Sequence, residues 1–168
     1  MAREGNRSAQ TQFYNASYKP IFNTSYRILK NKEEAEDVVH DTLINVFNKQ
    51  QLWPTHQNWT AWIKRIAINK SIDRLKKTSR IQLSEEQDLK SNFNEDFTFE
   101  SENTQKVEQI YKALMILPEH YRIVFSLFHI EGYDHTEISQ ILSIKESSSR
   151  SKLTRAKQLI IDHIQSNL

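Results

Sequence analysis

Apolar side chains recur at steps of three and four residues over most of the chain, which is the spacing of one face of a helix. The first run extends from Phe13 to Lys30 and predicts an amphipathic helix that bends or opens near Pro20. A second helix begins after Asn31-Lys32 with carboxylates, which suit a helix N-terminus, and continues to Phe47. A third helix is predicted from Thr60 to Thr78.

The helical pattern stops over residues 82–104 and returns at Lys106. A helix from there to Leu117 is followed by Pro118, which opens another helix that ends at Glu131-Gly132, where glycine is a usual stop signal. The sequence therefore predicts an all-α protein with two small helical domains, residues 1–81 and 105–168. A flexible acidic linker, residues 82–104, would join them.

The stretch from Tyr133 to Lys157 reads as a helix, a three-residue turn and a second helix. Asp134 and Glu137 have the spacing of a capping box at the start of the first helix. The second helix is apolar on one side and cationic on much of the rest. This arrangement predicts a DNA-reading helix-turn-helix in the C-terminal domain. A helical hairpin with a solvated charged face would give the same pattern.

The net charge of +2 conceals a strong segregation of charge along the chain. Residues 1–81 carry 14 Lys and Arg against 7 Asp and Glu, and residues 105–168 carry 8 against 7. Residues 82–104 carry 1 against 7. Basic segments on both sides of an acidic connector indicate nucleic-acid contact by the two domains and a different role for the connector.

Composition excludes several classes of protein. The sequence has no cysteine, so it can form neither disulfides nor cysteine-based metal sites. It has no apolar run of the length of a membrane span and no apolar signal-peptide core near its start. We therefore expect a soluble, cytoplasmic protein without membrane insertion.

Catalytic signals are weak. The six histidines are scattered, and the two glycines cannot build a phosphate-binding loop. The pair His40-Asp41 invites comparison with the all-helical phosphohydrolases that bind metal through a His-Asp pair, but those enzymes also need an earlier histidine, and none precedes His40. We expect no enzymatic activity, no cofactor and no bound metal.

Three features of the N-terminal domain leave two interpretations open. The polar side of the second helix could be merely solvated, or it could dock a basic partner. The loop at residues 50–59, rich in amides and aromatics, could capture unstacked bases, or Trp53 and Trp59 could simply fill the helix junction. The third helix, with six cations against the single Asp73, could be purely structural, but this excess of positive charge favours contact with DNA phosphates.

Three segments together resemble the extracytoplasmic-function sigma factors of bacterial RNA polymerase. AEDVVHDTLINVFNK (35–49) is similar to their polymerase-docking helix, and WTAWIKRIAINKSIDRLKK (59–77) to their promoter-melting helix. LPEHYRIVFSLFHIEGYDHTEISQIL (117–142) followed by SIKESSSRSKLTRAK is similar to their promoter-binding C-terminal domain. The resemblance covers about residues 10 to 165. It implies an alternative sigma factor that directs core RNA polymerase to promoter DNA and is controlled by an anti-sigma factor.

The resemblance also implies roles for individual residues. The residues that would contact the coiled-coil clamp of the largest polymerase subunit are Asp37, Asp41, Thr42 and Phe47. Those that would contact the minus-ten element are Thr55, His56, Gln57, Asn58 and Trp59 in the loop and Lys64, Arg65, Lys70 and Arg74 on the helix. Those that would contact the minus-thirty-five element are Lys145, Ser147, Ser148, Arg150, Ser151, Lys152 and Arg155. Trp62 falls where the family has a core tryptophan, and the linker would thread toward the polymerase active-site channel.

The sequence departs from the family pattern at four positions. His40 stands where glutamine is usual in the docking helix. Ser139, Ser143 and Ser149 stand where Ala, Gly and Val are commonest in the helix-turn-helix. We expect Ser143 to tolerate a turn that glycine prefers, and Ser149 to give up apolar burial of about 1 kcal/mol. The alternatives to a sigma factor are a helix-turn-helix regulator that does not bind polymerase and a helical metal phosphohydrolase.

Overall fold

The structure is a computed structural model that describes residues 7–49, 58–78 and 104–166. These residues form helices and short connections without any strand, so the predicted all-α class is confirmed for the described part of the chain. The chain divides into two compact units, Met1–Ile81 and Gln82–Leu168. Residues 82–103, most of the predicted linker, lie outside the described residues.

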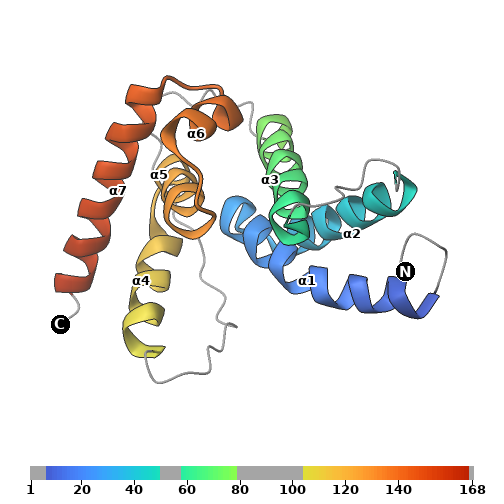
Figure 1. The fold of residues 1–168 in the computed structure, drawn as a ribbon. Coiled ribbons are helices and arrows are strands. Elements are labelled where there is room, and N and C mark those ends of the chain that lie inside the picture. The colour runs from blue at the N-terminus through green and yellow to red at the C-terminus, as the bar shows by residue number, and fades with distance from the viewer. Residues whose placement is uncertain (1–6, 50–57, 79–103, 167–168) are drawn as a thin grey trace. The chain divides into compact units, whose positions relative to one another are not determined.

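The first unit consists of α1 (Arg7–Leu29), α2 (Lys32–Asn48) and α3 (Trp59–Thr78), each packed against the other two (Figure 1). Helix α1 begins before the predicted Phe13 and runs through Pro20 without interruption. Its first turns are polar, so the apolar spacing could not reveal them. The core of the unit includes the buried aliphatic residues Ile21, Leu29, Val38, Val39, Leu43, Val46, Ile63 and Ala67, with aromatic side chains packed against them.

The second unit consists of α4 (Thr104–Ile116), α5 (Glu119–Phe125), the π-helical turn η3 (Ser126–Ile130), α6 (His135–Leu142) and α7 (Glu146–Ser166). Helices α4, α5 and α6 all pack on α7. The core between α4, α5 and α7 includes Leu114, Leu117, Ala156 and Ile160. The helix-turn-helix predicted from the sequence is therefore α6, the turn at residues 143–145 and α7.

Local hydrogen bonds explain where two of the helices begin. The Asn31 side chain accepts a hydrogen bond from the Glu34 N–H at 3.1 Å and caps α2. The predicted capping box of α6 is confirmed, because Asp134 Oδ1 accepts from the Glu137 N–H at 2.8 Å and Glu137 Oε2 accepts from the Asp134 N–H at 3.1 Å.

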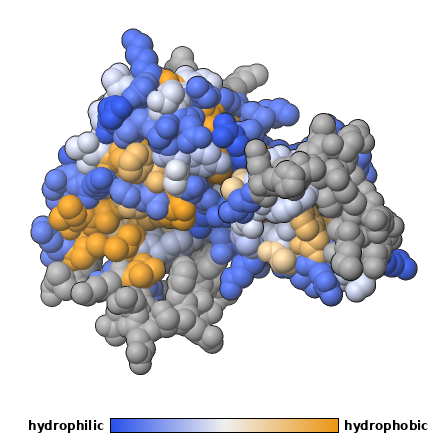
Figure 2. Space-filling view, in the orientation of Figure 1, coloured by the Kyte–Doolittle hydropathy of each residue, from blue (hydrophilic) through white to orange (hydrophobic). Residues whose placement is uncertain are grey.

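The surface of the second unit carries apolar side chains over α4 and α7 (Figure 2). The exposed aliphatic residues there are Val107, Ile110 and Ile116 on α4 and Ile161 on α7. Among the described helices, none is both long enough and apolar enough to cross a membrane.

Candidate functional site

The acidic side of α2 lies at the surface of the first unit. The Asp37 and Asp41 side chains are 66% and 51% exposed and stand one helical turn apart. Both carboxylates pair with Arg74 of α3: its Nη1 lies 3.1 Å from Asp37 Oδ2, and its Nη2 lies 2.9 Å from Asp41 Oδ2. One guanidinium group therefore bridges the two carboxylates, and it also ties α2 to α3.

The other two predicted docking residues face inward. Thr42 is fully buried, at 0% exposure, so the geometry gives no support to a direct contact between Thr42 and a partner protein. Phe47 is half-buried and packs its edge against Phe13 at a centroid distance of 5.6 Å. Of the four side chains predicted to contact polymerase, Asp37 and Asp41 are therefore the two that are exposed.

Arg74 was predicted to contact DNA, yet the structure engages its guanidinium with α2. Partial desolvation lowers the pKa of Arg74, but the hydrogen bonds to Asp37 and Asp41 outweigh that effect and leave the pKa above its ordinary value. The sequence does not reveal this bridge, because Arg74 is 37 and 33 residues away from its two partners.

The cations of α3 do not share one face. Lys70 and Arg74 are four residues apart and lie on the same side of the helix. Arg65 precedes Arg74 by nine residues, which at 3.6 residues per turn places it on the opposite side. Arg65 is exposed, whereas Lys64, Lys70 and Arg74 are half-buried. A single DNA strand following one face of α3 would therefore meet only part of this set.

The end of the predicted base-capturing loop has a structural role. Asn58 caps α3, because its Oδ1 accepts hydrogen bonds from the Thr60 N–H at 3.1 Å and the Ala61 N–H at 3.4 Å. Trp59 is half-buried and packs its edge against Phe13 at 5.9 Å and Trp62 at 5.7 Å. Trp59 thus fills the helix junction. The remaining loop residues, Thr55, His56 and Gln57, lie outside the described residues.

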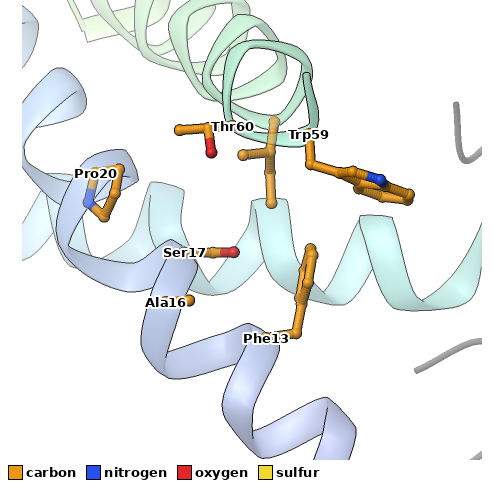
Figure 3. A pocket seen from close by; sticks show the side chains of 7 residues that line it. Phe13, Ala16, Ser17, Pro20, Trp59 and Thr60 are labelled. Carbon is orange, nitrogen blue, oxygen red and sulfur yellow. The ribbon is translucent and has the colours of Figure 1, made fainter. Parts of the chain in front are cut away.

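A groove between α1 and α3 opens beside Trp59 (Figure 3). Its volume is about 340 Å³, and it is lined by Phe13, Ala16, Ser17, Pro20, Trp59, Thr60 and Ile63. The lining is mostly apolar, and Figure 3 shows the Ser17 and Thr60 hydroxyls among the apolar side chains. Such a groove suits a largely apolar group that carries a few polar atoms.

The helix-turn-helix presents a row of polar side chains on α7. Ser147, Ser151 and Arg155 follow one another at four-residue steps and are all exposed, and they face away from the buried side formed by Ser149, Leu153, Ala156 and Ile160. Of the other predicted DNA contacts in this unit, Lys145 and Arg150 are exposed, and Ser148 and Lys152 are half-buried. Arg150 forms an ion pair with Glu146 in the same helix.

The serines that depart from the family pattern are accommodated in specific ways. Ser143 adopts φ 57° and ψ 42°, the left-handed conformation that glycine prefers, as predicted. Ser149 is completely buried, but its Oγ lies 2.9 Å from Nδ1 of His135. The expected loss of apolar burial is therefore accompanied by a hydrogen bond that the sequence analysis did not foresee.

No group of three or more His, Asp and Glu side chains in the described ranges is arranged to hold a metal ion. His40, the partner in the suggested metal-binding pair, is exposed on α2.

Comparisons with known proteins agree with the segments identified above. The family described as Sigma-70 region 2 matches residues 13–81, and Sigma-70 region 4 matches residues 107–160. Together these regions cover both helical units in the order expected.

Similar proteins include the extracytoplasmic-function sigma factor SigE of Mycolicibacterium smegmatis, which is 27% identical over 154 residues. That alignment covers 86% of this chain and 57% of SigE, so this chain spans little more than half of that relative. SigW of Bacillus subtilis is 23% identical over 168 residues, with 94% of this chain and 90% of SigW covered.

The fold is also similar to solved structures. The sigma factor RpoE of Bartonella quintana, solved with the anti-sigma factor NepR, matches with a TM-score of 0.62 at 19% identity, over 92% of this chain and 96% of RpoE. CnrH in complex with the cytosolic domain of CnrY gives a TM-score of 0.55 at 18% identity, over 99% and 94% of the two chains. With both sigma-70 regions present in order, this chain belongs to the extracytoplasmic-function sigma factors of bacterial RNA polymerase.

Proposed function

We propose that this chain acts as an alternative sigma factor in the cytoplasm, which brings core RNA polymerase to a specific set of promoters. The observation that carries the proposal is the separation of acidic and basic surface among the helices of the two sigma-70 regions. Helix α2 exposes carboxylates that suit a basic docking partner, while α3 and α7 expose cations that suit DNA phosphates. The chain would supply specificity, and polymerase would supply the chemistry.

In the first unit, Asp37 and Asp41 would meet the coiled-coil clamp of the largest polymerase subunit. Lys64, Arg65, Lys70 and Arg74 would contact the minus-ten element, with different strands or phosphates meeting the different sides of α3. The loop ending at Asn58 and Trp59, together with its undescribed residues Thr55, His56 and Gln57, would capture an unstacked base. Stacking on an aromatic ring can offset the few kcal/mol that unstacking costs.

In the second unit, α7 would lie in the major groove of the minus-thirty-five element. Its exposed row of Ser147, Ser151 and Arg155 would face the base edges, and Lys145, Ser148, Arg150 and Lys152 would approach from either side. Serine hydroxyls can donate to or accept from several bases, whereas arginine prefers guanine, so the arginine would contribute most of the discrimination.

We further propose that an anti-sigma factor controls the chain. RpoE, a protein of similar fold, was solved with the anti-sigma factor NepR, and CnrH was solved with the cytosolic domain of CnrY. An anti-sigma factor that covered the α2 carboxylates would compete with polymerase.

Run-off transcription with purified core polymerase on genomic fragments tests the proposal. We expect discrete transcripts that depend on the chain, and loss of open-complex formation when Lys64 and Lys70 are both changed to alanine. A chain that bound DNA but did not associate with core polymerase in a pull-down at any salt concentration would instead be a two-domain helix-turn-helix regulator. No observation favours a phosphohydrolase.

A further inference from the structure

The guanidinium of Arg74 serves two surfaces that the proposed function uses separately. It is bonded to both docking carboxylates of α2, at 3.1 Å and 2.9 Å, and it projects from the same side of α3 as Lys70. While this bridge persists, Arg74 neutralises part of the docking surface, and the docking surface in turn neutralises part of the cationic side of α3. The two surfaces therefore mask each other in the free protein.

The bridge is well suited to being exchanged. All three side chains remain partly exposed, at 30% for Arg74 and 66% and 51% for Asp37 and Asp41. Exposed ion pairs contribute little to stability, and ions in solution screen them. A cation presented by a docking partner could therefore replace Arg74 at the carboxylates at small cost.

The free protein also favours the bridged arrangement over one in which Arg74 faces solvent. Lys70 lies one turn before Arg74 on the same side of α3, and like charges at this spacing repel each other. Turning toward Asp37 and Asp41 relieves that repulsion and replaces it with two attractions. Once a basic partner holds the carboxylates, the Arg74 guanidinium loses both of these attractions and gains by contact with an external anion.

We propose that Arg74 is a positioning residue that couples polymerase docking to DNA binding. In the free chain it occupies Asp37 and Asp41; when basic side chains of core polymerase take these carboxylates, its guanidinium is released toward a DNA phosphate beside Lys70. This inference rests on the proposed function, because it assigns the carboxylates to polymerase and α3 to DNA. Since coupling between binding sites is reciprocal, DNA that binds Arg74 would also strengthen polymerase docking.

Arg74→Gln tests the coupling because it removes the positive charge and unmasks the carboxylates. We expect the variant to bind core polymerase about three- to tenfold more tightly than the wild type in the absence of DNA, as the loss of two exposed pairs allows. The assembled holoenzyme should bind promoter DNA more weakly, with a salt slope smaller by about one charge. Labelled chain and fluorescence anisotropy would measure both affinities at several salt concentrations.

The controls distinguish the effect of losing the Arg74 bridge from the effect of losing any one positive charge. Lys19→Gln removes one exposed cation from α1 and should change neither affinity. In the Asp37→Asn, Asp41→Asn background, Arg74→Gln should no longer increase affinity for core polymerase. Arg74→Lys keeps the charge but lacks the two-pronged geometry, so its affinity for polymerase should lie between those of wild type and Arg74→Gln.

Each outcome is decisive. If wild type binds core polymerase and Arg74→Gln binds equally well or more weakly, the coupling is refuted while the sigma-factor function stands, and Arg74 merely braces α2. Unfolding of Arg74→Gln would also refute the proposal, because an exchangeable surface bridge cannot be essential to the fold. If wild type itself fails to bind core polymerase, the proposed function is refuted.

Discussion

His135 Nδ1 lies 2.9 Å from the hydroxyl oxygen of Ser149, so the first helix of the helix-turn-helix is bonded to the buried side of the second. The His135 ring also stacks on Phe128 at a centroid distance of 4.7 Å. Ser149 is fully buried, and the ring nitrogen gives its hydroxyl a hydrogen-bond partner there. Ser149 therefore provides a polar link between α6 and α7.

Ser149→Ala should weaken the second unit by about 0.5 to 1.5 kcal/mol, the usual net value of a hydrogen bond. Because a chain of two units need not unfold in one step, amide hydrogen exchange in α6 and α7 is the appropriate measurement. Ser149→Val combined with His135→Phe should restore the lost protection by replacing both polar partners with apolar groups. Equal exchange rates in wild type and Ser149→Ala would show that this bond contributes nothing.

Thr42 should contribute to the stability of the first unit and not to the binding of core polymerase. Its side chain is fully buried, and its Oγ1 has no hydrogen-bond partner in the part of the chain that the structure describes. Thr42→Val replaces that hydroxyl with a methyl group of similar size, so we expect the first unit to become more stable by about 1 kcal/mol. Amide hydrogen exchange in α1, α2 and α3 would measure the gain. A loss of affinity for core polymerase in this variant would instead indicate that Thr42 contributes to docking.

Glu146 should make the α6–α7 contact sensitive to acid. Its hydrogen bond with Arg150 is the main reason that its pKa lies below the ordinary 4.5, and Thr136 also donates to it at 3.3 Å. A carboxyl whose pKa is lower in the folded state stabilises the fold above the unfolded pKa, and this contribution is lost as the pH falls through the folded pKa. Wild type should therefore lose hydrogen-exchange protection below about pH 4.5 more steeply than Glu146→Gln. Parallel profiles for the two proteins would exclude this role.

Arg155 and Arg150 should differ in their contributions to DNA binding. Arg155 belongs to the exposed row on α7, whereas Arg150 forms an ion pair with Glu146. Arg155→Ala should cost the holoenzyme about 1 to 3 kcal/mol of affinity for the upstream promoter element if it reads a base, and Arg150→Ala should cost less. Lys157→Ala is the matched control, because Lys157 follows Arg155 by two residues and its side chain therefore points to a different side of α7. Footprinting would measure promoter binding by all three variants. A larger loss of affinity for Arg150→Ala than for Arg155→Ala would indicate that Arg150 makes the more important DNA contact.

The helices, the division into two domains, the capping box and the placement of Ser143 in a turn that glycine prefers could all be predicted from the sequence. These features depend on local spacing, on capping side chains and on backbone conformation, which neighbouring residues along the chain decide. The similarity to the two sigma-70 regions could also be seen in the sequence, because it lies in continuous stretches of the chain.

The tertiary structure decided which partners the polar residues meet. Helical periodicity says which side of its own helix a residue occupies, but not which side chain another helix places opposite. For this reason Arg74 could be read from the sequence as a cation for DNA, although in the structure it bridges Asp37 and Asp41. Thr42 was expected at a docking surface but is buried, and Ser149 was expected to lose stability but is bonded to His135. Each depends on packing between helices, whose contacts join residues far apart in the chain.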